Sequence, residues 1–112
     1  MPDLQESMPD LGIVIVSYNV CDLLRDCLAS VYDSQGDFAF EVCVVDNDSH
    51  DGSADMVAEE YPQAQLIRTG NRGYAIGNNL GLRAFGFGDE GRSGSGQPRF
   101  ALLLNPDTVL PP

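Results

Sequence analysis

The stretch Leu102-Leu103-Leu104-Asn105-Pro106-Asp107 decides the fold, because an apolar run that stops on Asn-Pro-Asp predicts a buried strand with a carboxylate at its tip. Three earlier stretches repeat this pattern of an apolar strand followed by a polar tip. They are Ile13–Val16 before Ser17-Tyr18-Asn19, Val42–Val45 before Asp46-Asn47-Asp48, and Leu66-Ile67 before Asn71-Arg72-Gly73. The four stretches predict one sheet whose polar tips gather at a single edge.

Between the strands, apolar residues recur at helical spacing and predict three amphipathic helices. The expected inward faces are Val20, Leu23, Leu24, Cys27, Leu28 and Val31; then Ala54, Val57, Ala58 and Tyr61; then Ile76, Leu80 and Ala84. Asn19 is the expected N-cap of the first helix, and Pro62 is expected to stop the second. Gly77 and Gly81 each cost about 1 kcal/mol inside a helix relative to Ala. Close approach of the backbone to a ligand or a strand is the expected reason for them.

The alternation of strands and helices predicts an α/β fold with a mostly parallel, doubly wound sheet and right-handed crossovers. We expect the Rossmann-like strand order 3-2-1-4, with helices on both faces. Ligands of such sheets bind at the carboxyl ends of the strands, where the winding reverses. That position would bring Ser17-Tyr18-Asn19 beside Asn105-Pro106-Asp107, with Asp46 one strand further along.

Length and composition predict one domain over residues 11–112 after a flexible lead over residues 1–10. The formal net charge is −11 and all six basic residues are Arg, which argues against nucleic acid or anionic lipid as a partner. A small phosphorylated ligand held through a divalent cation remains compatible with this charge. The three cysteines form no CxxC pair, which favours reduced thiols and a cytoplasmic protein, and no signal or transmembrane segment is recognisable.

Each polar tip has a functional and a structural interpretation. Asp107, with Asn105 as a second oxygen donor, could hold Mg²⁺ or Mn²⁺, or it could cap an Asx-Pro turn. Asp46 could accept hydrogen bonds from a ribose or a base, or it could only turn the chain. Tyr18 could stack on a base or pack against the first helix. His50, the one histidine, is expected to be solvated.

Taken together, the tips resemble the nucleotide-binding half of the inverting family 2 glycosyltransferases, which have the GT-A fold. The matching stretches are Val14–Asn19, Val44–Ser53, Asn71–Gly81 and Leu103–Asp107. The first aspartate of the family's DxD motif is Asn105 here, which is similar to the rhamnosyl- and galactofuranosyl-transferase branch.

This resemblance implies roles for individual residues. Tyr18 and Asp46 would bind the base, Val16 would add a backbone contact, and Arg72 would close over the nucleotide. Gly73 and Asn79 would shape the sugar-nucleotide pocket, beside Asn105, and Asp107 would hold the divalent ion on the diphosphate.

The resemblance also implies a UDP- or dTDP-sugar donor and a glycan or lipid-linked acceptor, in cell-wall or surface polysaccharide synthesis. The general base of the family lies downstream of the metal motif. We therefore expect this chain to be an amino-terminal fragment that is inactive alone, self-associates through an uncovered edge and, at full length, is peripheral at the inner membrane. The alternative is a non-catalytic nucleotide-binding or oligomerisation module with the same fold.

Overall fold

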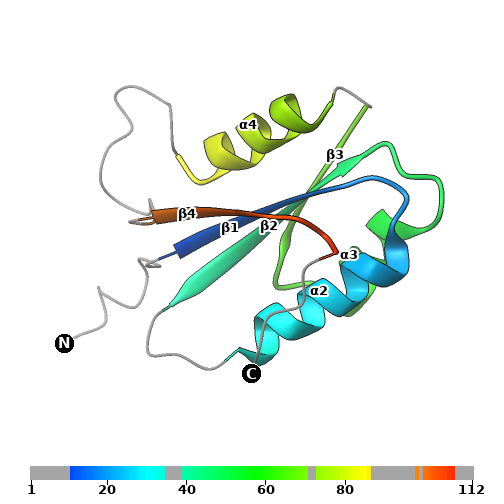
Figure 1. The fold of residues 1–112 in the computed structure, drawn as a ribbon, viewed down its shortest axis with the longest axis horizontal. Coiled ribbons are helices and arrows are strands. Elements are labelled where there is room, and N and C mark those ends of the chain that lie inside the picture. Colours follow the sequence, from blue (N-terminus) through cyan, green and yellow to red (C-terminus); the bar gives the residue numbers. More distant parts are fainter. Residues whose placement is uncertain (1–10, 35–38, 71–72, 87–97, 99, 108–112) are drawn as a thin grey trace.

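The computed structural model describes residues 11–34, 39–70, 73–86, 98 and 100–107. The strands are β1 (Leu11–Ser17), β2 (Phe40–Asn47), β3 (Gln65–Thr69) and β4 (Phe100–Leu104), and the helices are α2 (Cys21–Asp33), α3 (Ser53–Glu60) and α4 (Tyr74–Ala84). They follow one another as strand, helix, strand, helix, strand, helix, strand, as the sequence predicts (Figure 1).

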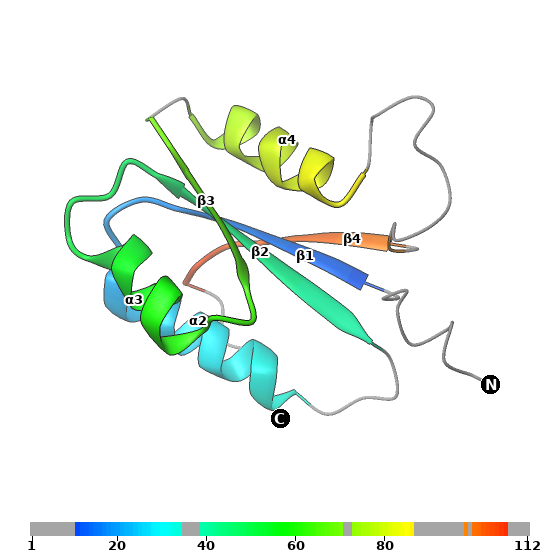
Figure 2. The same ribbon diagram turned by 180° about the vertical axis from the view of Figure 1, so that it is seen from behind.

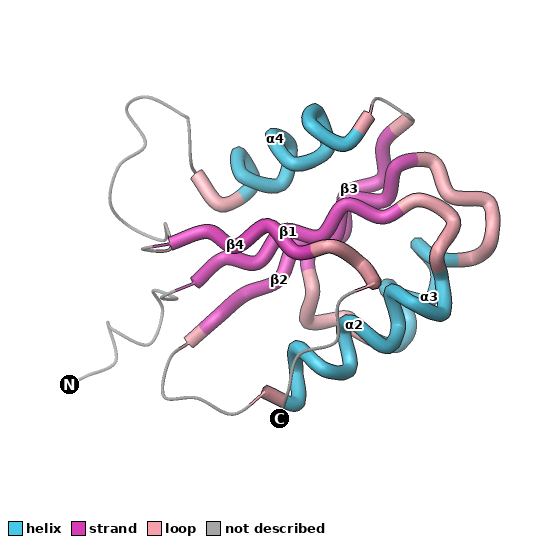
Figure 3. The backbone as a smooth tube through the Cα atoms, viewed as in Figure 1, coloured by secondary structure: helices cyan, strands magenta, loops and turns pink. Residues whose placement is uncertain are grey.

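The four strands form one parallel sheet in the order β3-β2-β1-β4, which confirms the predicted topology. Helices α2 and α3 cover one face of the sheet and α4 covers the other (Figures 1 and 2). The sheet is therefore the middle of three layers, which is clearest when the backbone is drawn as a tube (Figure 3). None of the described helices is long and apolar enough to cross a bilayer.

Strand β1 is buried on both faces because each face meets a separate apolar cluster. Ile13 and Ile15 pack with α2 and α3, whereas Val14 and Val16 pack in a second cluster with Phe85, which follows α4. A central strand of a parallel sheet is expected to be apolar throughout for this reason. The unbroken run from Ile13 to Val16 thus reports a strand covered on both sides.

Helix α4 lies unusually close to β1, and its two internal glycines explain the approach. A Cβ added at Gly77 would meet Cγ1 of Val16 at 2.8 Å, and one added at Gly81 would clash with the side chain of Val14. The strand, rather than a ligand, is therefore the reason for both glycines. The predicted face of this helix was correct at Leu80, which packs against the second cluster, and wrong at Ile76 and Ala84, which are exposed. The two glycines face the sheet instead.

Four other sequence predictions need correction. β4 is not a buried strand: it is an edge strand on which only Leu104 is buried, while Phe100, Leu102 and Leu103 are exposed. Asn19 does not cap α2. The N-cap position is Val20, and no side-chain hydrogen bond caps the helix. Leu23 on α2 and Ala58 on α3 point to solvent instead of the core.

Candidate functional site

The carboxyl ends of β1, β2 and β4 meet at one edge of the sheet (Figure 1). Ser17 pairs with Asp46 across β1 and β2, and Ile15 pairs with Leu104 across β1 and β4. Tyr18, Asp46 and the Asn105–Asp107 segment therefore leave the sheet at this shared edge. The predicted juxtaposition of these polar tips is present in the structure.

Asp46, the second-last residue of β2, has a buried carboxylate with one oxygen in a hydrogen bond and one without. The backbone N–H of Ser49 donates to Oδ2 at 3.1 Å, which is the turn bond of the structural interpretation. The other oxygen, Oδ1, is buried and has no hydrogen-bond partner among the described residues. A buried polar atom without a partner costs roughly 1–3 kcal/mol, so a ligand that donates a hydrogen bond there would be favoured. The turn bond and a free acceptor thus coexist in one side chain.

Two other buried polar atoms lack a partner in the described part of the chain, and sequence reasoning missed both. Ser17 Oγ lies one strand away from Asp46, on the residue that pairs with it. Asn78 Oδ1 lies on α4, on the opposite face of the sheet from α2. In each case the prediction named the neighbouring residue instead, Tyr18 next to Ser17 and Asn79 next to Asn78.

Tyr18 is about half exposed, with 47% of its surface open to solvent. A ring packed away against α2 would be mostly buried, so this ring is available to a ligand. His50 is exposed as expected, with its Nε2 3.8 Å from the Asp48 carboxylate.

Asn105 is held from both faces of the sheet. The Tyr74 hydroxyl on α4 donates to Asn105 Oδ1 at 3.1 Å, and the Cys27 thiol on α2 donates to the Asn105 carbonyl at 3.8 Å. Burial raises the pKa of Cys27 to about 11, and the negative charge of Asp107 adds to this effect. Asp107 is itself exposed and lies close enough to α2 for its charge to act there.

The donor set at this edge fits an ion that arrives with a substrate. The described residues contain no group of three or more His, Cys, Asp or Glu side chains placed to enclose a metal. Mg²⁺ and Mn²⁺ are often bound by one or two carboxylates plus substrate phosphates and water. One exposed carboxylate, Asp107, is compatible with that mode and not with a closed metal site.

Two of the remaining predicted residues, Gly73 and Asn79, lie next to or on α4. Gly73 precedes α4 with φ of 90°, a conformation that glycine adopts without strain, and Asn79 is exposed on the helix. The side chain of Val16 is buried against Gly77, which leaves only its backbone for a ligand. Arg72 lies outside the described residues.

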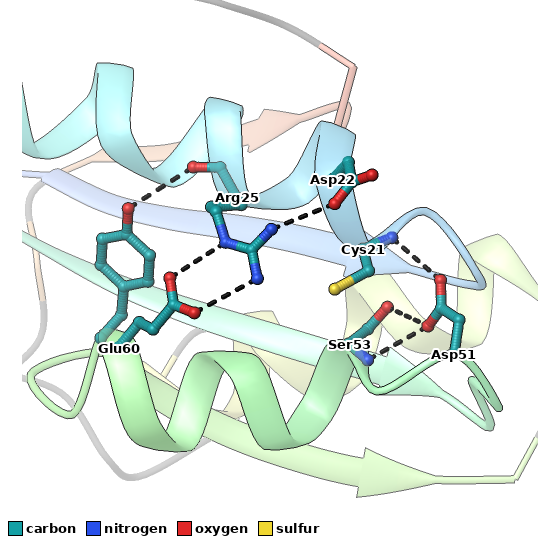
Figure 4. Close-up of polar contacts among 7 residues, drawn as sticks. Cys21, Asp22, Arg25, Asp51, Ser53 and Glu60 are labelled. Atoms are coloured by element: carbon teal, nitrogen blue, oxygen red, sulfur yellow. Dashed lines mark hydrogen bonds and ion pairs between the residues drawn. The ribbon is translucent and has the colours of Figure 1, made fainter.

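Sequence reasoning also missed a set of hydrogen bonds that joins the β1–α2 loop to the β2–α3 loop. Asn19 N–H donates to Ser49 Oγ at 2.9 Å, and His50 N–H donates to Asn19 Oδ1 at 2.7 Å. Asp51 accepts hydrogen bonds from Cys21 N–H at 3.0 Å and from the backbone and hydroxyl of Ser53 (Figure 4). Its carboxylate thereby bonds the first residue of both α2 and α3.

The Asp51 carboxylate is electrostatically matched to this position. The Ser53 hydroxyl, followed by the backbone amides of Cys21 and Ser53, holds the pKa of Asp51 below its ordinary value of 3.8. Carboxylates are favourable near helix N-termini, where backbone N–H groups lack partners.

An open pocket of about 410 Å³ is lined by Asn19, Val20, Cys21, Asp22, Leu23 and Asp51, so it is separate from Asp46.

Comparison with known proteins identifies the architecture around this edge. Residues 12–86 match the family described as Glycosyl transferase family 2, and this range contains β1 through α4. The chain belongs to glycosyl transferase family 2. The match includes the ends of β1 and β2 and the glycines of α4, and it stops before β4.

Two relatives of this family 2 chain are described as uncharacterized glycosyltransferases. YibD of Escherichia coli strain K12 is 29% identical over 82 residues, which are 70% of this chain and 24% of YibD. YfnE of Bacillus subtilis strain 168 is 38% identical over 75 residues, which are 64% of this chain and 19% of YfnE. The chain thus spans about a quarter or less of the length of these relatives.

Two solved structures share the fold of this chain. Mannosyltransferase PcManGT from Pyrobaculum calidifontis, in complex with GDP-Man and Mn²⁺, superimposes with a TM-score of 0.69 at 26% identity, over 94% of this chain and 29% of PcManGT. TarS 1-349 of S. aureus gives a TM-score of 0.65 at 21% identity, over 89% of this chain and 28% of TarS 1-349. The α/β GT-A-like fold is therefore shown, and PcManGT carries both a nucleotide sugar and a divalent cation on it.

Proposed function

We propose that the protein containing this chain transfers a sugar from a nucleoside diphosphate donor to an acceptor hydroxyl with inversion at the anomeric carbon. The observation that carries the proposal is the unpartnered Asp46 Oδ1, buried at the edge where the exposed Tyr18 and Asp107 also lie. Membership of family 2 and the GDP-Man complex of PcManGT support it.

We assign Asp46 and Tyr18 to the base of the donor. The unpartnered Asp46 Oδ1 can accept a hydrogen bond from an N–H group of the base. The ring N–H of uracil, thymine or guanine is such a donor. UDP- and dTDP-sugars are the proposed donors, GDP-sugars fit the same acceptor, and the Tyr18 ring would stack on the base.

We assign Asp107 to a divalent cation on the donor diphosphate, with Asn105 beside it. When bound, Mg²⁺ or Mn²⁺ supplies neutralisation of the charge that develops on the leaving nucleoside diphosphate. The neutral Asn105 leaves Asp107 as the one carboxylate of the motif. Backbone of Val16, the turn at Gly73, the exposed Asn79 and Arg72 complete the proposed donor site. A general base must also take the proton of the acceptor hydroxyl, and we assign that role to no described residue.

We further propose the type of sugar, the acceptor, the location of the protein and its self-association. The Asn105 variant supports a hexosyl- or rhamnosyl-type transferase, with a glycan or lipid-linked acceptor and a role in cell-wall or surface polysaccharide synthesis. We place the protein in the cytoplasm, peripheral at the inner membrane at full length. The exposed apolar side chains of β4 support self-association, because an uncovered strand edge can pair with another copy.

Titration of the purified chain with UDP-, dTDP- and GDP-sugars, with and without Mn²⁺, tests the donor site by calorimetry. We expect metal-dependent binding of at least one donor, weakened about tenfold or more in Asp46→Asn, since a base hydrogen bond to a charged acceptor is lost. Asp107→Ala should remove the dependence on Mn²⁺.

Asp33→Ala is the matched control for both variants. Asp33 ends α2, at the far end of the sheet from the proposed site, so its removal should leave donor affinity unchanged. Absence of binding by any of the three donors would refute the proposal and favour a non-catalytic module with the same fold.

A further inference from the structure

We propose that Ser49 and Asn19 are positioning residues that set the geometry of the base-binding end of the donor site. This inference rests on the proposed function. It gives a role to the hydrogen bonds between the β1–α2 and β2–α3 loops.

Ser49 couples the two residues assigned to the base. Its backbone N–H donates to Asp46 Oδ2 at 3.1 Å, and its hydroxyl accepts from Asn19 N–H at 2.9 Å. The first bond fixes which carboxylate oxygen of Asp46 stays unpartnered, because Oδ2 is occupied and Oδ1 is not. The second bond holds the peptide that directly follows Tyr18. One serine therefore sets the orientation of the acceptor and the position of the ring.

Asn19 completes the connection through its side chain and its backbone conformation. Its φ is 52°, in the left-handed region that asparagine tolerates better than most residues. In this conformation its Oδ1 accepts from His50 N–H at 2.7 Å while its own N–H reaches Ser49. The two loops are thus bonded reciprocally, from Asn19 to Ser49 and from His50 back to Asn19.

Asp51 is not part of these contacts and has a different role. It bonds the first residues of α2 and α3, and the Arg25–Glu60 ion pair joins the same two helices further along (Figure 4). These contacts fix the helices against each other. The Ser49–Asn19 contacts instead act on Tyr18 and Asp46, the two residues assigned to the base, so loss of Ser49 should change the site more than the fold.

A purely structural role for these bonds predicts a different pattern of binding. If Ser49 only stabilised the loops, its removal would lower stability and affect every ligand of the edge to the same extent. If Ser49 positions the base-binding residues, its removal lowers the affinity for ligands that have a base and leaves the affinity for ligands with only phosphates unchanged. Inorganic pyrophosphate with Mg²⁺ is such a ligand, since in the proposed site it would bind the cation at Asp107 and has no base for Asp46.

The test compares Ser49→Ala, Ser49→Thr and a matched control by heteronuclear NMR titration, which measures weak affinities in a 12.1 kDa chain. Ser34→Ala is the control, because it also removes one hydrogen bond between a serine hydroxyl and the backbone: Ser34 Oγ donates to the Ser30 carbonyl at the other end of α2. The ligands are UDP, GDP and pyrophosphate, each with Mg²⁺ to avoid paramagnetic broadening. Amide exchange of Asn19 is followed in the free protein.

We expect Ser49→Ala to speed hydrogen exchange of the Asn19 amide. The affinity for the nucleotide should fall about five- to tenfold, which corresponds to the loss of roughly one hydrogen bond. Pyrophosphate affinity should be unchanged, Ser49→Thr should restore nucleotide affinity, and Ser34→Ala should change neither ligand. Equal weakening of nucleotide and pyrophosphate, or unchanged nucleotide affinity in Ser49→Ala, would overturn the inference alone. Failure of the unmodified chain to bind UDP and GDP would overturn the proposed function as well.

Discussion

Replacement of Gly77 by alanine tests the close contact between α4 and β1, on which the position of the donor site depends. The added Cβ would lie 2.8 Å from Cγ1 and 3.0 Å from Cγ2 of Val16. Ordinary carbon contacts lie near 3.5–4.0 Å. Rotation of the Val16 side chain can place its hydrogen in only one of these two positions, so a close methyl contact remains and the helix must move away from the strand.

The net effect is the difference between two opposing contributions. Alanine is favoured over glycine inside a helix by about 1 kcal/mol. Overpacking of a buried contact costs about 1–3 kcal/mol, and the upper value applies because Val16 belongs to the central strand and is only 6% exposed. We therefore expect Gly77→Ala to lower the free energy of unfolding by about 2 kcal/mol, or Tm by roughly 10 °C.

Urea and thermal denaturation followed by circular dichroism measure this change. Ala84→Gly, at the exposed last residue of the same helix, has no contact with the strand to relieve and should destabilise by less than about 1 kcal/mol, the value for a helix interior. In a Val16→Ala background the clash is removed, so Gly77→Ala should become stabilising there. If Gly77→Ala stabilises the unmodified chain, α4 does not lie against β1 as described and the reasoning is refuted.

Three further predictions concern other parts of the molecule. Iodoacetamide at pH 8 should alkylate only Cys21 in the folded chain, because burial raises the pKa of Cys27 and of Cys43 to about 11; mass spectrometry that finds three rapid modifications would contradict this. Asp51→Asn should be less stable than the unmodified chain near neutral pH, and the difference should vanish as the pH falls through 3.8 and below, since the pKa of Asp51 is lowered by folding; a difference that persists in acid, measured by urea denaturation, would argue against the Asp51 contacts. Leu103→Glu on the exposed β4 edge should reduce self-association in sedimentation velocity, and a monomeric unmodified chain at the same concentration would disprove that edge as a contact.

The sequence predicts the fold well because periodicity and strand-tip chemistry agree along the whole described chain. The run Ile13–Val16 has no alternation, which is the pattern of a strand buried on both faces, and the structure confirms it. The strand order is the Rossmann-like order expected of a doubly wound sheet, and the structure confirms it. The glycines of α4 were correctly attributed to a close approach of the backbone. The inward face of the helix was predicted correctly only at Leu80, because a pattern of apolar residues does not show that a glycine faces a strand.

The site was predicted in part, and the missing part is not visible in a linear pattern. Asp46 and Tyr18 stand at strand ends, where type and position are informative. Ser49 and Asn19 act through bonds between residues 30 positions apart, and only the paired loops reveal them. Local preference made Asn19 look like a helix cap, whereas tertiary contact with His50 N–H determines its conformation. Burial of β4 was overestimated because its composition does not reveal that it is an edge strand.

The central claim is that Tyr18, Asp46 and Asp107 serve one nucleotide-sugar site, and paramagnetic relaxation by Mn²⁺ tests it most directly. With a nucleoside diphosphate bound, Mn²⁺ should broaden the amide resonances of Asn105 and Asp107 most strongly, with a smaller effect at Ser17 and Tyr18 across the shared edge. Amides at the amino ends of the strands, such as Phe40, should be unaffected. Broadening centred on that opposite end, or broadening that does not depend on the nucleotide, would contradict the account.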